Sequence, residues 1–361
     1  MRTTFNLFIL LLVVVCGRLT YDLIQKNQSI STMSDGCLSD MADEVVAIPL
    51  QSVGDEVVHS PRKIRKDGNN LFLISGKSLL RFDLSGNFIC AITDTALTRV
   101  GDYIVNPEEQ QFIVLGNEND LFYFTYDGTL LCKKKWQLNP LEQRRVISAV
   151  MHQRKIWTTE EVVRKDQASS KTYVCQEIVE YDASFNKIQS YPIKPIDLAR
   201  ANCAISSFSP IVAIRPETEE IYAYTPSLQL DDLLRDTLYI QSKLRYNSFK
   251  DWVGDEAIPL LPIFLGARIW FSEYQDPDNA APNYIFCYDT QKGKGWLNSD
   301  GLIDDFYQTG SIKRLEAMDP YGESFCFYKS GETVRNAFSN QVNADSCVVF
   351  VAHLKENDRS C

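Results

Sequence analysis

The stretch NLFLISGKSLLRFDLSGNFIC, residues 70–90, is repeated in modified form as FIVLGNENDLFYFTYDGTLLC, residues 112–132. A shift of 42 positions aligns the two without a gap and places Gly86 on Gly128 and Cys90 on Cys132. A period near forty residues, made of short β-rich runs separated by turns, is typical of the four-stranded blade of a β-propeller. The turns agree, because the Asp and Gly of DLSG and YDG suit tight hairpins.

The same pattern continues downstream with insertions. Further units begin with KIWTTEEVV, EEIYAYTP, ARIWFSEY and ESFCFYKSG, and two insertions at 159–176 and 226–238 account for the excess length. The run EVVAIPLQS (44–52) remains without a partner, and a ring of blades must close to avoid an exposed sheet edge. We therefore expect an all-β fold, a six-bladed β-propeller of four-stranded antiparallel blades whose last blade is closed by this N-terminal strand.

The beginning of the chain carries a targeting signal. Arg2 precedes an uninterrupted apolar run from Leu7 to Val15, which has the length of a signal-peptide core and is too short to span a bilayer. The sequence thus predicts export, to the periplasm or the outer membrane.

Cys16 ends the apolar run and is the candidate lipid anchor. Val15 stands where a small residue normally precedes a lipidated cysteine, so ordinary cleavage nearby and an uncleaved anchor are the alternatives. The predicted organisation is a signal peptide over 1–16, a flexible tether over 17–43 and the propeller over 44–361.

Composition excludes some partners. The 361 residues carry a formal net charge of -10, which argues against a nucleic-acid partner, because phosphate binding needs clustered Lys and Arg. Two short basic stretches, SPRKIRK (60–66) and CKKKW (132–136), are interpreted as solvated blade edges.

The ten cysteines do not define a disulfide framework. Without Cys16 nine remain, an odd number, and no CxxC spacing occurs among them. Most lie in apolar strand-like runs such as NFICAI, YIFCYD and ESFCFY, where we expect them to serve as small buried hydrophobes. The state of Cys37 and Cys361, in polar terminal segments, stays open.

A resemblance to a known family rests on several stretches, listed here: AIPLQS (47–52), LFLISGKSLLRFDLSGNFICAI (71–92), RVGDYIVNPEEQQFIVL (99–115), LYIQSKLRYNSF (238–249) and YIFCYDTQKGKGWLNSDGLIDDFYQTG (284–310). With them the chain resembles the six-bladed, NHL- and TolB-like β-propellers that Bacteroidetes-type bacteria export, often as lipoproteins. The resemblance covers nearly the whole chain from about residue 44, and it implies a fold and an envelope location more than an activity. One departure is RVGDY (99–103), where the family usually carries a Gly-Pro-Gly-Glu-Tyr-like loop.

Motifs of catalysis are missing from the sequence. It has three histidines and no G-x-S-x-G, H-E-x-x-H, P-loop or Rossmann fingerprint, so no catalytic residue, metal ligand or cofactor is predicted. An all-oxygen calcium site of the kind used by six-bladed hydrolases and lyases stays as the alternative.

The candidate ligand-binding residues are Asp304, Asp305 and Trp296. Adjacent carboxylates serve one site only if they lie in a turn, which Gly301 and Gly310 allow, and the competing interpretation is that they cap backbone amides at a blade junction. Trp296 follows KGKG and is free to be exposed. Trp157 and Trp270, at equivalent positions of two units, are expected to pack between blades.

The sequence therefore predicts a non-enzymatic binding or scaffold module of the cell envelope. Its partner would be a glycan, a peptide or an envelope protein, and its contact with membrane would be limited to the N-terminal lipid anchor. The alternative is a calcium-dependent hydrolase or lyase of the six-bladed propeller type.

Overall fold

The computed structural model describes the chain from Gly36 onward, so the predicted signal peptide, Cys16 and most of the predicted tether lie outside the described residues. The described residues are 36–54, 58–92, 97, 100–116, 120–136, 143–165, 172–192, 196–197, 211–214, 221–225, 235–240, 243–248, 260–266, 268–275, 283–289, 294–298, 301–319, 321–338 and 347–355.

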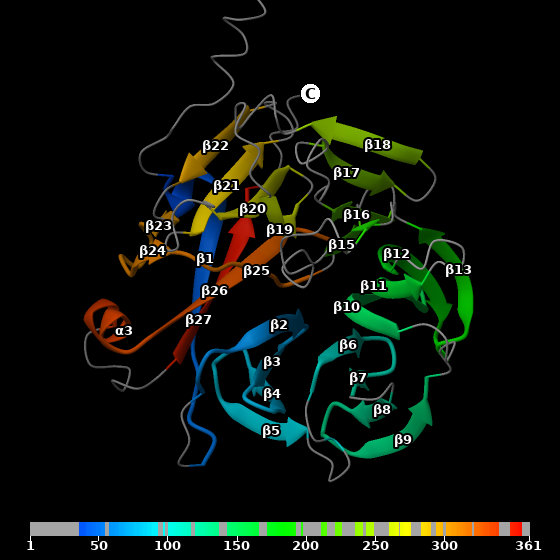
Figure 1. Ribbon diagram of the computed structural model, residues 1–361. Helices are drawn as coiled ribbons and strands as arrows, with labels where there is room; N and C mark the ends of the chain where they lie inside the picture. The colour runs from blue at the N-terminus through cyan, green and yellow to red at the C-terminus, as the bar shows by residue number, and fades with distance from the viewer. Residues whose placement is uncertain are drawn as a thin grey trace, which may run out of the picture.

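Antiparallel sheets account for nearly all of this structure (Figure 1). The first is formed by β2 (Arg62–Asp67), β3 (Asn70–Ser75), β4 (Ser78–Asp83) and β5 (Phe88–Ile92). The second is formed by β6 (Asp102–Asn106), β7 (Gln111–Leu115), β8 (Asp120–Thr125) and β9 (Leu130–Lys135). The third is formed by β10 (Gln143–His152), β11 (Lys155–Lys165), β12 (Thr172–Asp182) and β13 (Lys187–Pro192), with the short β14 (Ile196–Asp197) also paired to β12.

The later sheets repeat this order. One is formed by β15 (Ile211–Ile214), β16 (Ile221–Thr225), β17 (Arg235–Ile240) and β18 (Lys243–Ser248). The next is formed by β19 (Leu260–Leu265), β20 (Ile269–Gln275), β21 (Asn283–Asp289) and β22 (Lys294–Asn298). The last is formed by β25 (Glu316–Ala317), β26 (Ser324–Ser330), β27 (Cys347–Leu354) and β1 (Ala42–Pro49). A separate hairpin consists of β23 (Leu302–Asp304) and β24 (Gly310–Ile312).

The strands β2, β6, β10, β15, β19 and β25 lie nearest to a common centre (Figure 1). β2 contacts β6 and β25, β10 contacts β6 and β15, and β19 contacts β15 and β25. This arrangement is that of a β-propeller with four-stranded antiparallel blades, as the repeat predicts.

The N-terminal strand completes the last blade, as predicted. β1 pairs with β27 in antiparallel register, with Val45 opposite Ala352. Ordered structure begins earlier than the predicted propeller boundary, because the 3-10 helix η1 (Leu38–Asp40) precedes β1 and the side chains of Leu38 and Met41 are buried. Pairing across the two ends of the chain removes a sheet edge that would otherwise be free.

Neighbouring blades share hydrophobic cores. In β3 the four central residues are all buried, since both faces of a blade are covered by other blades. Phe72 of β3 packs edge-on against Phe112 of β7, with ring centroids 4.5 Å apart. Trp157 and Trp270 are also buried, and Trp157 stacks on Tyr191 of its own blade, so their expected packing between blades stays a prediction. Burial of a phenylalanine side chain contributes roughly 1.5–3 kcal/mol, so each blade is stabilised chiefly by its neighbours.

The repeated turn between the third and fourth strands has a defined chemistry. Asp83 accepts hydrogen bonds from the backbone N–H groups of Ser85 and Asn87, both at 2.9 Å, and from the Asn87 side chain at 2.7 Å. The Asn87 hydrogen bonds lower the pKa of Asp83. Gly86 has a φ of 85° and approaches the backbone of Pro49 so closely that an added Cβ would lie 1.8 Å from its carbonyl oxygen. The glycine is therefore required both by its φ and by the space available.

Some predicted details differ. The expected insertion at 159–176 is in large part an extension of the paired strands β11 and β12, which have 11 residues each. A short helix, α3 (Glu332–Ala337), follows β26 and has no counterpart in the prediction. Of the helices in the described part of the chain, none is long and apolar enough to cross a membrane.

The cysteines of the apolar strands behave largely as expected. Cys287, Cys326 and Cys347 are free and buried, and burial raises the pKa of each thiol. Cys90 is half-buried and Cys132 is exposed, so the small-hydrophobe interpretation does not hold for Cys132. Cys37 is part-buried and its backbone N–H donates to Asp40 at 3.3 Å, and Cys361 lies outside the described residues.

Candidate functional site

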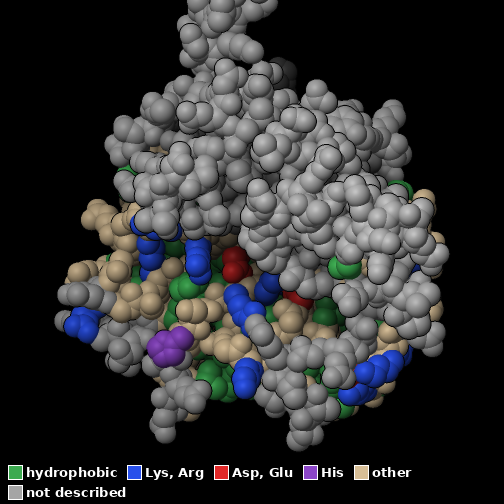
Figure 2. Space-filling model, in the orientation of Figure 1, with side chains coloured by type: hydrophobic (Ala, Val, Ile, Leu, Met, Phe, Trp, Pro, Cys, Tyr) green, Lys and Arg blue, Asp and Glu red, His purple; other side chains and the backbone are tan. Residues whose placement is uncertain are grey.

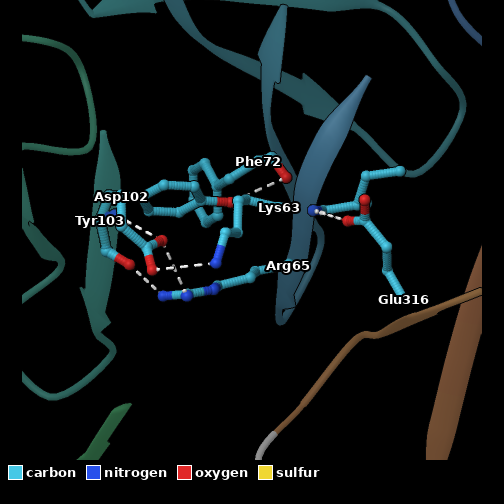
Figure 3. Close-up of polar contacts among 7 residues, drawn as sticks. Lys63, Arg65, Phe72, Asp102, Tyr103 and Glu316 are labelled. Atoms are coloured by element: carbon cyan, nitrogen blue, oxygen red, sulfur yellow. Dashed lines mark hydrogen bonds and ion pairs between the residues drawn. The ribbon is translucent and has the colours of Figure 1, made fainter. Parts of the chain in front are cut away.

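Charged side chains meet where β2, β6 and β25 approach the centre of the molecule. We call the group Lys63, Arg65, Asp102, Tyr103 and Glu316 the axial cluster (Figure 3). In β2 a bulge between Arg62 and Arg65 inserts an extra residue, and Lys63 adopts a φ of 53°. Bulges re-aim side chains at the rims of sheets, and this one directs two cations toward β6.

Asp102 is the anionic centre of the axial cluster. Its carboxylate accepts hydrogen bonds from Lys63 Nζ at 3.2 Å and from Arg65 Nη2 at 3.1 Å. The side chain of Asp102 is 6% exposed, whereas those of Lys63 and Arg65 are 37% and 20% exposed. One buried carboxylate thus holds two cations that still reach solvent.

Tyr103 orients the arginine. The Arg65 guanidinium carbon lies 4.7 Å from the centre of the Tyr103 ring and its Nη1 donates to the Tyr103 carbonyl oxygen. The Tyr103 hydroxyl bonds the carbonyl oxygens of Lys63 at 2.6 Å and Phe72 at 3.0 Å. Burial raises the pKa of Tyr103 well above its ordinary value, so the hydroxyl stays protonated and can act as a donor. These contacts fix the stacked geometry of Arg65 before any ligand arrives.

Glu316 brings the last blade to the same place. Its Oε2 accepts a hydrogen bond from the backbone N–H of Ile64 at 3.0 Å. Burial raises the pKa of Glu316, against the opposing effect of that hydrogen bond and of Lys63 and Arg65. In the space-filling view, basic and acidic side chains gather around the centre of this face (Figure 2).

A second charged group lies within the third blade. Arg144 of β10 donates to Glu160 of β11 at 2.6 Å and to Glu177 of β12 at 3.2 Å. Glu160 also accepts hydrogen bonds from Thr158 at 2.6 Å and from the Tyr181 hydroxyl at 2.7 Å. We call Arg144, Glu160 and Glu177 the buried triad, because their side chains are 6%, 0% and 2% exposed.

The two groups suit different tasks. The side chains of the buried triad are at most 6% exposed, while the two cations of the axial cluster are 37% and 20% exposed. Arg and Lys in this position bind carboxylates and other oxyanions through charge-assisted hydrogen bonds. Of the axial cluster and the buried triad, the axial cluster is the one suited to bind a ligand.

Metal binding finds no support in the part of the chain that is described. Among these residues, no group of three or more His, Cys, Asp or Glu side chains is placed to hold an ion. The calcium-dependent alternative stays a prediction that no observation favours.

Asp304 lies at the end of β23 in the hairpin with β24. It is 1% exposed, and its carboxylate accepts hydrogen bonds from the backbone N–H groups of Phe306, Tyr307 and Thr309 at 3.1–3.3 Å. Asp304 therefore caps backbone amides of its own turn, which agrees with the alternative interpretation that these carboxylates are structural.

Asp305 points elsewhere and binds the N-terminal segment. It accepts hydrogen bonds from the backbone N–H of Ser39 at 3.0 Å and from the Ser39 hydroxyl. Partial burial raises the pKa of Asp305, but the Ser39 hydrogen bonds outweigh this and leave it below its ordinary value. The structure thus gives Asp304 and Asp305 separate partners, and their role in ligand binding stays a prediction. Trp296 lies in β22, and its side chain is outside the described structure.

The axial cluster was not selected from the sequence. SPRKIRK, interpreted as a solvated blade edge, is β2 and supplies Lys63 and Arg65. RVGDY, the departure from the family loop, supplies Asp102 and Tyr103. The available signal was their position, since both stretches are the first strand of a repeat unit and such strands lie nearest the propeller axis.

Comparison with known proteins gives fold-level likeness. No family model and no curated protein matches the chain. It is similar to a chain of the crystal structure of a nidogen/laminin complex, with a TM-score of 0.38 and 10% identity, covering 63% of this chain and 74% of that one. It is also similar to the β-propeller domain of Cps50 (Swd1) from Myceliophteria thermophila, with a TM-score of 0.46 and 8% identity, covering 82% of this chain and 98% of that one. What identifies the chain as a β-propeller is its own arrangement of four-stranded blades.

Proposed function

We propose that this chain is a non-enzymatic binding module that holds a segment of a partner protein at the axial cluster. The observation that carries the proposal is the pair Lys63 and Arg65, part-exposed and held by the buried Asp102. A carboxylate of the partner, from an acidic side chain or a chain terminus, would bind beside these two part-exposed cations. Binding would cost little side-chain conformational entropy, because Arg65 is already held against the Tyr103 ring.

The proposed architecture is a closed ring of six blades. Six sheets of at least four strands support it, together with the contacts that link β2, β6, β10, β15, β19 and β25 in succession and return from β25 to β2. Closure brings charged groups from the first, second and last blades to one place. This would explain how residues as distant in sequence as Ile64 and Glu316 form one cluster.

The proposed location is the bacterial envelope. The apolar run from Leu7 to Val15 and the resemblance to exported Bacteroidetes-type propellers support export, and Cys16 is the proposed lipid anchor. Expression in a bacterium fed an alkyne-labelled fatty acid tests this. Label in the wild-type protein but not in Cys16→Ser supports the anchor, and unlabelled wild-type protein in the membrane-free fraction contradicts it.

Arrays of peptides and glycans test the binding function. We expect wild-type protein to bind acidic peptides at low salt, and the double variant Lys63→Met/Arg65→Met to lose that binding. Arg154→Met is the matched control, because Arg154 is also a cation beside two carboxylates, Glu108 and Glu109, but is 71% exposed and lies outside the axial cluster. Equal binding by all three proteins would contradict the proposal.

A further inference from the structure

The outer strand of the second blade, β9, has unusual surface properties. β9 is the terminal strand of its sheet, and among the described residues no strand pairs with its outer edge (Figure 1). All six of its residues are exposed. A free edge presents a row of backbone N–H and C=O groups that a further strand can bind.

The first half of this edge is apolar. Leu130 is 39% exposed and Leu131 is 48% exposed, so two consecutive large hydrophobic residues reach solvent where the pairing of β9 with β8 shifts in register. Ile89 of β5 and Ile188 of β13 occupy the position equivalent to Leu131 and are 42% and 53% exposed. The outer strands of three successive blades therefore each expose a large apolar side chain. Of these three strands, β9 is the one that exposes two.

The second half is basic. Lys133 and Lys135 both pair with Asp120, at 3.1 Å and 2.9 Å, so two ammonium groups share a single carboxylate. Lys134 lies on the other side of the strand, 4.8 Å from the centre of the Tyr123 ring. In a chain of net charge -10, β9 is a local concentration of positive charge, and a row of basic side chains is visible at this rim (Figure 2).

We propose that β9 is a second interaction surface, which takes an extended segment of another protein as an additional antiparallel strand. Antiparallel pairing sets the order of residues in that segment, an acidic stretch opposite Lys133–Lys135 followed by an apolar stretch opposite Leu130 and Leu131. The backbone of the segment would satisfy the free edge, its carboxylates would complement the lysines, and its apolar side chains would cover the leucines.

Other occupants fit less well. A second copy of the chain paired edge to edge through β9 would bring six lysines together, three from each copy, and these like charges repel one another. A lipid surface offers no strand to pair with the backbone groups of β9. Edge lysines can also serve only to prevent unwanted strand pairing, and this is the interpretation that the experiment must separate from the proposal.

The test uses the 361-residue chain and a synthetic capped peptide of three glutamates followed by threonine, valine and leucine, and binding is read by fluorescence anisotropy. We expect saturable binding, and about tenfold or greater weakening for Lys133→Glu/Lys134→Glu. Arg154→Glu is the control, because Arg154 is a 71% exposed cation that lies outside β9. The fold-weakening caused by Lys133→Glu/Lys134→Glu should be the same in wild type and in the axial background Lys63→Met/Arg65→Met, which separates this surface from the proposed axial function.

Backbone methylation distinguishes strand pairing from simple charge attraction. Two peptides, N-methylated at alternate residues on one edge or on the other, keep the same charges, and we expect only one of them to lose binding. Equal binding of both would overturn the proposal, as would binding of the reversed sequence with equal affinity or no binding at all. A dimer that is abolished by Lys133→Glu/Lys134→Glu, or binding to anionic lipid vesicles in place of the peptide, would also overturn it.

Discussion

The axial cluster and the buried triad use the same chemical groups with different exposure. In the triad, Glu160 and Glu177 are directly opposite each other on β11 and β12, and Arg144 is shared between two like charges that water does not reach. In the axial cluster two part-exposed cations share the buried carboxylate of Asp102, while the second carboxylate, Glu316, accepts a backbone hydrogen bond from Ile64. Removing a partner should therefore unfold the blade in the first case and free a cation into solvent in the second.

The largest effect is expected from Arg144→Met. It leaves two buried carboxylates facing each other, and loss of one partner from a buried ion pair costs about 3–5 kcal/mol. Urea unfolding measures the change in free energy of unfolding. The triple variant Arg144→Met/Glu160→Gln/Glu177→Gln is the control and should regain a large part of the loss. If Arg144→Met lowered the free energy of unfolding by less than about 1 kcal/mol, the buried triad would not be the more structural of the two groups.

Two tyrosines sharpen the contrast. Tyr181 donates to the buried carboxylate of Glu160, whereas Tyr103 bonds backbone carbonyl oxygens. Because hydrogen bonds to charged groups contribute more than neutral ones, we expect Tyr181→Phe to lower the free energy of unfolding by about 2 kcal/mol and Tyr103→Phe by about 1 kcal/mol. Thermal and urea unfolding of both variants measure this, and the opposite order would argue against the assigned roles.

Asp102→Asn should lower the stability about as much as Tyr103→Phe. The amide retains the shape of the side chain, and Lys63 and Arg65 can be solvated, so we expect a loss of about 1 kcal/mol in stability. Loss of 3 kcal/mol or more, as for a closed buried pair, would show that the axial cluster is as structural as the triad.

The smallest effect is expected at Asp305, which is exposed and bound to Ser39. Its folded-state pKa is lowered, so its contribution to stability is present above the unfolded-state pKa and is lost as the pH falls through the folded-state pKa. At neutral pH Asp305→Asn should cost about 0.5 kcal/mol, and this difference from wild type should shrink below about pH 4. Urea unfolding at both pH values measures it, and a difference that grows in acid would contradict the assignment.

The sequence was sufficient for the architecture because the blade is a local unit. The repeat at 42 residues, the Asp and Gly turns and the unpaired N-terminal run predict the four-stranded blades and the pairing of β1 with β27. These features depend on side-chain alternation and turn chemistry within short segments, which a single sequence shows directly.

The axial cluster could not be predicted in the same way. The ion pair of Arg65 with Asp102 joins the first blade to the second. The hydrogen bond from Ile64 to Glu316 joins the first blade to the last, which is far away in sequence. Basic residues of SPRKIRK and CKKKW look alike in sequence, yet the first stretch forms the inner strand β2 and the second the outer strand β9, where the interpretation as an exposed edge is confirmed. The bulge that directs Lys63 toward Asp102 has no clear signal in the residues themselves.

The most direct test of the central claim measures stability and binding on one variant, Lys63→Met/Arg65→Met/Asp102→Asn, in which no buried carboxylate is left without its cations. We expect a free energy of unfolding within about 1 kcal/mol of wild type, together with at least tenfold weaker binding of the best acidic peptide from the array. A large loss of stability with binding unchanged in the protein that remains folded would contradict the account and make the axial cluster a structural element of the propeller.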